Sequence, residues 1–333
     1  MTALRKERTP PGEAAPSAPF FIVGAFRSGS TLLRMMLSSH SRLTIPPETW
    51  YLIPLVRQFP IDRPLHPAEI ESVVSTMTTH YRWPDMKLDA REFRRRVSLL
   101  TEPYLRDLPE VVYRSFLDAR GKVRWADKSP PYIEIVPELA RMYPGARFIH
   151  LFRDGRDVTK SFHATGWAGS RWLHDSTRQW TRALEWHWRW VRSEFRDLIL
   201  PVRYEQLVLE TEPTLREICR FVGEEFESQM LAWGRIVDDE LFPREVPYHG
   251  KLKQRMGAEG VARWMHELSA RETFVCESFM GSHLRRLGYP LRYSSPLWRP
   301  AFGLTRLGCT TLLPAYDSAA RFRRRLLSPL RST

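Results

Sequence analysis

Cysteine is scarce in this sequence, with three residues among 333, and none of them forms a CxxC pair. A number that is both small and odd argues against a disulfide scaffold, and the missing CxxC pairs argue against the common zinc sites. We therefore expect no metal site of this kind. A reducing compartment fits such a chain best, so we expect it to be cytoplasmic.

Long apolar runs are also missing. No stretch approaches 18 uninterrupted apolar residues, the length that a membrane-spanning helix needs. Residues 1–18 have a basic start but no apolar segment, which favours a flexible lead over a signal peptide. Hydrophobic residues nevertheless make up 43% of the chain and aromatic residues 12%, so the sequence predicts a soluble globular protein.

Acidic residues are outnumbered, because 51 lysines and arginines face 38 acids and leave a net charge of +13. Such a surplus favours an anionic partner. Nearly half of it lies in residues 295–333, which hold seven arginines and a single acid, Asp317. The body of the chain has no basic stripe and no nucleic-acid motif, so we do not expect nucleic acid as the partner. The tail is either solvated or in weak contact with an anionic membrane surface.

Three apolar, β-prone runs are each followed by a helical pattern. The runs are residues 20–23, 147–152 and 198–204. The helix after the first run begins at about Leu32, the second extends from Asp154 to about residue 163, and the third covers residues 211–222. Further helices are predicted at about 132–142, within 65–120 and 170–196, and at 270–287. Strands that alternate with helices predict an α/β fold with a central parallel sheet flanked by helices.

The predicted helical stretch 170–196 carries five tryptophans. Tryptophans at helical spacing usually face a core, and we favour that interpretation over stacking on a ligand.

The first strand-to-helix turn, Gly24 to Thr31, has the composition of an anion-binding loop. It keeps both glycines and the final hydroxyl of the pattern GxxxxGK[ST], but Ser30 replaces the lysine and Arg27 supplies a cation instead. Backbone N–H groups at a helix N-terminus bind phosphate without that lysine. The loop therefore suits a nucleotide with a single 5′-phosphate better than a triphosphate.

A second candidate anion site follows the second apolar run. Arg153 stands at the end of this run, where open parallel sheets bind their ligands, and it can hold a phosphate through two hydrogen bonds. Ser161 lies about two helical turns further on and offers a hydroxyl to the same anion.

These two segments, Gly24 to Leu37 and Phe148 to Phe162, resemble the sulfotransferases that use 3′-phosphoadenosine 5′-phosphosulfate (PAPS). The resemblance extends over residues 19–290 and implies a three-layer P-loop-like fold whose helical inserts form the acceptor pocket. The chain then divides into the lead 1–18, the domain 19–290 and a basic extension 291–333. The donor-binding residues that it implies are Arg27, Ser28, Gly29, Ser30 and Thr31 for the 5′-phosphate, Arg153 and Ser161 for the 3′-phosphate, and Tyr204 beside the adenine. Arg255 and Gly257 match a late RKGxxG loop, in which Met256 replaces the usual lysine.

Glu48 is the candidate general base. By position alone it is a surface or helix-capping glutamate in the segment Pro46-Pro47-Glu48-Thr49-Trp50. In the tyrosylprotein and heparan-type sulfotransferases, which the motif layout resembles most, a glutamate at this place removes the proton of the acceptor. Trp50 stands where the tyrosylprotein type has a basic residue, which argues against an acidic peptide substrate.

Two cations are candidates for the leaving phosphate, Lys128 and Arg27. Lys128 lies in Asp127-Lys128-Ser129-Pro130, which resembles the family's Lys-(Ser/Asp)-Pro element. The simpler interpretation is an ion pair of Lys128 with Asp127 or another acid. His40 and His80 are reserve candidates for the base, since the Lys-x-His segment of the small-molecule sulfotransferases is not evident.

The sequence thus predicts a metal-independent sulfuryl transfer from PAPS to a hydroxyl or amine. The alternatives are a P-loop kinase-like enzyme and a nonenzymatic nucleotide-binding protein. The aromatic helical segments predict an acceptor with an apolar or aromatic portion, such as a small molecule, a lipid or a glycan.

Overall fold

The structure is a computed structural model that describes residues 18–166, 171–243, 245–246 and 258–307. The chain divides into two compact units, Met1–Arg153 with Ala183–Gly260 and Asp154–Arg182 with Val261–Thr333. The first unit contains the sheet, and the described part of the second is helical.

Five parallel strands form one sheet in the order β2-β3-β1-β4-β5. The strands are β1 Phe20–Gly24, β2 Leu43–Thr44, β3 Arg124–Lys128, β4 Arg147–Phe152 and β5 Ile199–Arg203. Ile22 of the central β1 pairs with Lys128 on one side and with Ile149 on the other. The predicted α/β fold with a parallel sheet is confirmed, as are the three strands predicted from apolar runs.

Sequence analysis missed two strands, β2 and β3. Strand β3 has the sequence Arg-Trp-Ala-Asp-Lys, in which three of five residues are charged, and so it does not resemble a buried strand. All five residues are nonetheless buried, because the charged side chains at its two ends find carboxylate partners: Arg124 pairs with Glu224 and Lys128 with Glu48.

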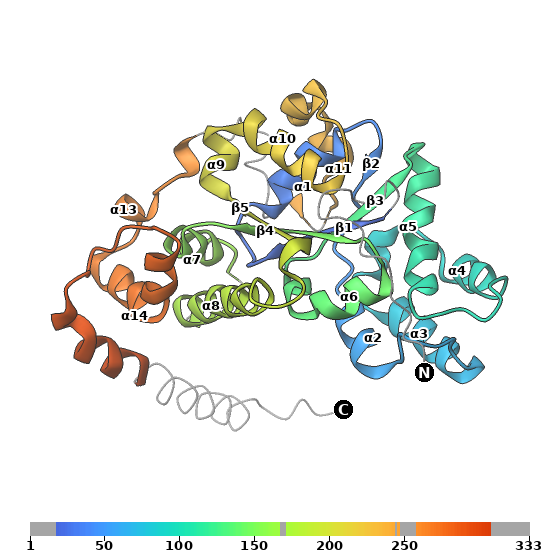
Figure 1. Ribbon diagram of the computed structural model, residues 1–333, viewed down its shortest axis with the longest axis horizontal. Helices are drawn as coiled ribbons and strands as arrows, with labels where there is room; N and C mark the ends of the chain where they lie inside the picture. The colour runs from blue at the N-terminus through green and yellow to red at the C-terminus, as the bar shows by residue number, and fades with distance from the viewer. Residues whose placement is uncertain (1–17, 167–170, 244, 247–257, 308–333) are drawn as a thin grey trace, which may run out of the picture. The chain divides into compact units, whose positions relative to one another are not determined.

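Helices cover both faces of the sheet in the first unit. They are α1 Ser30–Ser38, α2 Leu52–Gln58, α3 Pro67–Thr79, α4 Ala90–Val97, α5 Asp107–Arg120, α6 Val136–Met142, α9 Tyr204–Leu209, α10 Thr211–Val222 and α11 Val237–Glu240, with the 3₁₀ segments η1 Trp83–Met86, η2 Pro130–Ile135, η4 Arg196–Leu198, η5 Ser228–Ile236 and η7 Ala258–Gly260. In Figure 1, α1, α9, α10 and α11 lie on one side of the sheet and α6 on the other. The helix predicted at 132–142 begins instead with η2, because prolines at 130, 131 and 137 delay the regular α-helical hydrogen bonds.

A separate core fills each face of the sheet. On the first face, Ile22 and Ile149 belong to a cluster with apolar side chains of α1 and α10. On the second face, Phe21 stacks on Phe148 with ring centroids 5.4 Å apart. It also meets Trp125 edge-on and packs against the tilted ring of Tyr143. The burial of both faces leaves the strand ends as the places where polar side chains gather.

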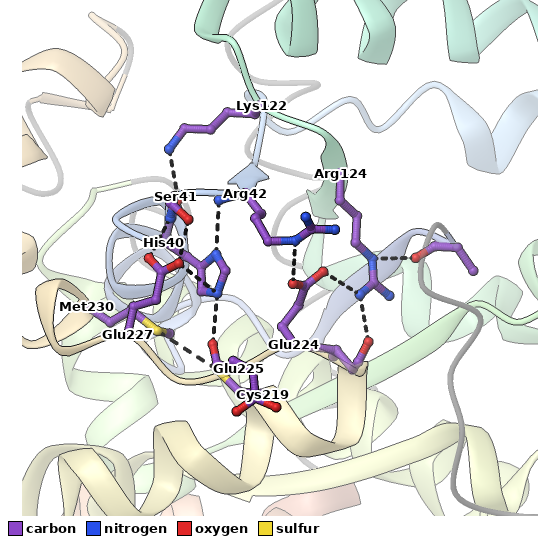
Figure 2. A network of polar contacts seen from close by, with 12 residues as sticks. His40, Ser41, Arg42, Lys122, Arg124, Cys219, Glu224, Glu225, Glu227 and Met230 are labelled. Atoms are coloured by element: carbon purple, nitrogen blue, oxygen red, sulfur yellow. Dashed lines mark hydrogen bonds and ion pairs between the residues drawn. The ribbon is translucent and has the colours of Figure 1, made fainter.

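A polar network lies at the amino ends of β2 and β3 (Figure 2). The carboxylate of Glu224 accepts hydrogen bonds from Arg42 and from the buried Arg124, each at 3.0 Å. Arg124 also donates to the carbonyl oxygens of Ala18, at 2.6 Å, and Val222, at 2.7 Å. The network thus joins the start of the described chain and the end of α10 to the sheet.

The described helices of the second unit are α7 Gly155–His163, α13 Trp264–Glu267 and α14 Ala270–Arg286, with the 3₁₀ turn η8 Pro296–Trp298 and a helical continuation over residues 299–307. The predicted helices at 154–163 and 270–287 are confirmed to within a residue or so. Arg156 is fully buried and pairs with both Asp154 and Glu277 at 2.7 Å, which ties α7 to α14.

Helix α8, Trp172–Trp190, contributes residues to both units and carries the five tryptophans. Only Trp180 is buried; the other four are partly exposed. The prediction of a core-facing stripe is therefore right for Trp180 alone. The indole N–H of Trp190 is satisfied by a hydrogen bond, because its Nε1 donates to the carbonyl oxygen of Ile133 at 2.7 Å. No helix in the described parts of the chain has the length and apolarity needed to cross a bilayer.

Candidate active site

The loop between β1 and α1 has the backbone of an anion cradle. Gly29 caps α1 in the left-handed region, at φ 98°, and Arg27 shares that region at φ 67°. A Cβ atom on Gly24 would lie 2.5 Å from the carbonyl oxygen of Leu151, so this position accepts only glycine. The first turn of α1 leaves its backbone N–H groups without partners inside the helix, and the helix dipole adds positive potential there.

Three hydroxyl groups surround this cradle, those of Ser28, Ser30 and Thr31, and all three residues are buried. Thr31 accepts a hydrogen bond from Lys128 at 3.3 Å. The Ser28 hydroxyl has no hydrogen-bond partner among the described residues. A buried polar group in this state is costly unless a ligand satisfies it, which fits a loop that receives an anion.

Tyr204 connects the loop to the ends of β4 and β5. A Cβ atom on Gly29 would lie 2.3 Å from the Tyr204 ring, so the glycine lets the loop approach the ring face directly. The Arg153 guanidinium lies over the same ring, 4.3 Å from its centroid, and donates a hydrogen bond to the carbonyl of Gly260. Three of the residues assigned to the donor, Gly29, Arg153 and Tyr204, are thus brought together.

Arg27 lies within electrostatic reach of both Arg153 and Glu48. Burial and the nearby Arg153 lower the pKa of Arg27 to about 10, while Glu48 opposes that shift. The guanidinium therefore stays charged at neutral pH, and two like charges are held near each other. An anion with more than one negative charge relieves this repulsion, so the pair favours a phosphorylated ligand.

The Glu48 carboxylate is held by two cations. One of its oxygens accepts a hydrogen bond from Lys128, and the other accepts from Arg82 at 3.1 Å. The Glu48 side chain is 12% exposed and the Lys128 side chain 1%. The structure thus places Glu48 in the interior of the site, and not on the surface as its position alone suggests.

Lys128 lies among several groups of opposite sign. Besides Glu48 it faces Glu245 at 3.6 Å, and Glu245 is itself held by both terminal nitrogens of the fully buried Arg34, at 2.9 and 2.7 Å. The expected acid partner, Asp127, is not among the ion pairs of Lys128 in the described chain. Arg34 lies within the segment Gly24 to Leu37, but its residue type alone did not indicate a role. Glu245 and Arg82 are distant in the sequence from any motif.

Asp127 instead anchors the segment that carries Glu48. One of its oxygens accepts hydrogen bonds from Thr49 and from Tyr113, each at 2.8 Å. The backbone N–H of Thr49 also donates to the Ser129 hydroxyl at 3.2 Å. Burial raises the pKa of Asp127 to about 6, against these hydrogen bonds and with some help from the charge of Glu48. In the sequence, the only feature that drew attention to Asp127 was its position next to Lys128.

An aromatic cluster borders Glu48. Trp50, in the left-handed region at φ 55°, lies 5.2 Å from the Phe26 ring and 6.1 Å from the Tyr81 ring. The Arg82 guanidinium that holds Glu48 lies over the Trp50 ring, 4.7 Å from its centroid. Tyr81 is 51% exposed, so part of the cluster is open to solvent.

The remaining predicted residues lie elsewhere. Ser161 is on α7, in the second unit, and Arg255 and Gly257 lie outside the described residues. His40 belongs to the network at the amino ends of the strands, where its ring bonds to the Glu225 carbonyl (Figure 2). The His80 ring packs against Tyr81 at 4.7 Å, and burial lowers its pKa. In the part of the chain that the structure describes, no three His, Cys, Asp or Glu side chains cluster in a way that could hold a metal ion.

Comparison with known proteins finds sulfotransferases both in a family model and among individual relatives. A sequence model of the sulfotransferase family matches residues 19–228. Protein-tyrosine sulfotransferase 1 of Danio rerio is 28% identical over 210 residues, which is 61% of this chain and 52% of that protein. The nodulation protein NoeE of Sinorhizobium fredii is 30% identical over 145 residues, or 44% of this chain and 31% of that protein. The matches thus span about a third to a half of the length of these curated relatives.

Among solved structures, the sulfotransferase domain from the curacin biosynthetic pathway matches with a TM-score of 0.57 and 19% identity, and covers 84% of this chain and all of that domain. The sulfotransferase domain from the Synechococcus olefin synthase matches with a TM-score of 0.50 and 20% identity over 91% of this chain and 98% of that domain. At these identities the structural likeness establishes the fold alone.

Proposed function

The chain belongs to the sulfotransferase family, and from that premise we propose that it transfers a sulfuryl group from PAPS to a hydroxyl or amine of an acceptor. In this reaction the bond between sulfur and the bridging phosphate oxygen breaks, and a bond from sulfur to the acceptor atom forms. The acceptor loses a proton, and adenosine 3′,5′-bisphosphate leaves. The observation that carries the proposal is that Arg27, Lys128 and Glu48 meet beside an anion-binding loop.

The residues at this end of the sheet fit the donor nucleotide. The N-terminus of α1 with Ser28, Ser30 and Thr31 would hold the 5′-phosphate, and Arg153 on the Tyr204 ring would hold the 3′-phosphate. Ser161, Arg255 and Gly257 remain proposed donor contacts. The donor supplies the activated sulfuryl group, and the chain's part is to bind it, neutralise charge and manage the acceptor proton.

Glu48 is the proposed base, and its ion pair with Lys128 suggests when it acts. Both carboxylate oxygens of Glu48 are engaged by cations, one by Lys128 and the other by Arg82. A phosphate group near Lys128 competes with Glu48 for the ammonium, which leaves the carboxylate free to accept a proton. We therefore expect the donor to bind before the acceptor is deprotonated.

Lys128 and Arg27 are the proposed partners of the negative charge that grows on the departing phosphate. Preorganised cations in a buried site stabilise such charge without reorganising at the moment of reaction. They supply the positive charge that magnesium supplies in kinases, so we propose that the reaction needs no metal.

The acceptor would lie against Phe26, Trp50 and Tyr81, which border Glu48. Their rings favour an acceptor with an apolar or aromatic portion, whether a small molecule, a lipid or a glycan. The names of the relatives add a protein tyrosine side chain to these candidates.

The substitution Glu48→Gln tests the proposal. It keeps the size and hydrogen-bonding capacity of the side chain but removes the base, so turnover with PAPS across a panel of phenols should fall by roughly 10²-fold or more. Calorimetry should still show binding of adenosine 3′,5′-bisphosphate. Glu71→Gln, on an exposed part of α3, is the matched control and should leave both unchanged. Full turnover by Glu48→Gln would remove Glu48 from the mechanism.

A further inference from the structure

The second unit exposes an unusual group of apolar side chains near the end of the described chain. Leu297, Trp298, Leu304 and Leu307 are 86%, 42%, 72% and 59% exposed. The other large apolar side chains that are exposed in the described residues are spread over the rest of the chain. We refer to residues 296–307 as the terminal platform.

The terminal platform is helical and firmly attached. It consists of η8 and the helical residues 299–307, in which Leu297, Leu304 and Leu307 are spaced seven and three residues apart. This spacing places them along one side of a helical segment. Leucines exposed along one side of an attached helix form an apolar surface that a partner can cover.

Two sets of contacts attach the platform to α14. Phe274 of α14 packs against Trp298 at 5.7 Å and against Phe302 at 4.8 Å. The carboxylate of Glu277, also on α14, accepts hydrogen bonds from the backbone N–H groups of Arg292 and Tyr293, at 2.9 and 2.8 Å. These bonds orient the chain as it enters the platform, so its exposed leucines are presented on a defined scaffold.

The charged side chains of the platform and of the stretch that leads into it are of one sign. Arg292, Arg299 and Arg306 are exposed, and residues 290–307 contain no acid. The sequence from 308 onwards adds five arginines against Asp317. A protein partner would need a matching acidic surface and an apolar groove together, whereas an anionic bilayer offers negative headgroups above an apolar layer at every point.

We propose that the terminal platform docks on an anionic phospholipid surface. Leu297, Leu304 and Leu307 insert into the boundary between headgroups and acyl chains, with Trp298 at the level of the headgroups. Arg299 and Arg306 of the platform pair with lipid phosphates, as does the exposed Arg292 that precedes it. The bound state lies on the membrane and does not span it.

The test is sedimentation of the full-length protein with vesicles of phosphatidylcholine alone, or of phosphatidylcholine containing phosphatidylglycerol. We expect binding to the anionic vesicles that weakens as salt is raised, and little binding to phosphatidylcholine. The double variant Leu304→Glu with Leu307→Glu should lower the fraction bound roughly tenfold or more. Leu99→Glu with Leu209→Glu, at leucines that are 70% and 58% exposed elsewhere in the chain, is the matched control and should bind normally.

Three results would overturn the proposal: no binding to the anionic vesicles, equal loss in the control variant, or unchanged binding in the Leu304→Glu, Leu307→Glu variant. The last would mean that arginines alone attract the protein to lipid. Since all four substituted leucines are exposed, thermal unfolding should be unchanged, which separates lost docking from lost folding. A protein partner in place of lipid would appear as failure to bind either kind of vesicle.

Discussion

At the scale of single residues, Gly29 shows how closely the loop between β1 and α1 is packed against Tyr204. Its φ of 98° and the 2.3 Å that would separate a Cβ atom from the Tyr204 ring both exclude a side chain. Tyr204 also supports Arg153, so a shift of the ring displaces the proposed 3′-phosphate contact. The lack of a side chain at Gly29 therefore lets the loop and Arg153, both proposed anion contacts, pack against the same ring.

We predict that Gly29→Ala lowers the free energy of unfolding by about 1–3 kcal/mol, since it forces both strain and overpacking. The affinity for adenosine 3′,5′-bisphosphate should fall at least about tenfold by calorimetry. Gly234→Ala is the control, because a Cβ atom there meets no atom within 4 Å. Normal affinity in Gly29→Ala would contradict the packing of the loop on Tyr204.

Asp127 gives a prediction about pH. Its pKa is raised to about 6 in the folded protein, mainly by burial, so the folded state holds this proton more tightly than the unfolded chain does. Stability from this group is present in acid and is lost as the pH rises from about 4 to about 6. Asp127→Asn removes this titration, so the variant does not lose this stability as the pH rises. The difference in the free energy of unfolding between the variant and the natural protein should therefore shift in favour of the variant by up to about 3 kcal/mol across this range.

Urea unfolding at pH 4, 5, 6 and 7 measures this difference. Asp118→Asn, at an exposed position of α5, should follow the natural protein at every pH. A constant gap between Asp127→Asn and the natural protein would show that Asp127 does not titrate in this range.

Some of the site could be predicted from single residues and some could not. Arg27, Glu48, Lys128 and Arg153 stand in short motifs whose chemistry is recognisable without a structure. Partners such as Arg82 and Glu245 come from distant, unremarkable sequence, and only folding brings them to Glu48 and Lys128. A charged residue on a helix or loop does not disclose which buried charge it will neutralise.

At the scale of secondary-structure elements, β3 is the most informative. Each end of β3 carries a cationic side chain, and the two make different contacts. Lys128, at the carboxyl end, faces the proposed base, and Arg124, at the amino end, holds Ala18, Val222 and Glu224 (Figure 2). The apolar patterns of β1, β4 and β5 made them predictable, whereas β3 is stable in the sheet through partners that its own sequence does not show.

We predict that Glu224→Gln lowers the free energy of unfolding by about 3 kcal/mol or more, because it leaves the buried Arg124 without its carboxylate. Arg42→Gln removes the other, half-exposed partner of Glu224 and should cost only about 0–1 kcal/mol. Urea unfolding measures both. Bisphosphate affinity should stay unchanged in the two variants, and equal losses of stability would show that Arg124 does not depend on Glu224.

At the scale of the whole molecule, the alternation of strands and helices was enough to predict a parallel sheet with its ligand at the carboxyl ends of the strands. The acceptor was beyond prediction, because the residues proposed to surround it come from segments such as the turn after α3 that carries Tyr81, which follow no shared pattern. The positive charge of the chain is concentrated in two places. Part of it lies at the proposed anion site at the end of the sheet, and part lies with the terminal platform.

The central claim is that this anion site holds a nucleotide with separate 5′ and 3′ phosphates. The most direct measurement is calorimetric titration with adenosine 3′,5′-bisphosphate in magnesium-free buffer, with ATP as the comparison. We predict tight binding of the bisphosphate, weak binding of ATP, and loss of bisphosphate binding in Arg153→Ala. Binding of ATP alone, strengthened by magnesium, would contradict the claim and favour a kinase-like enzyme.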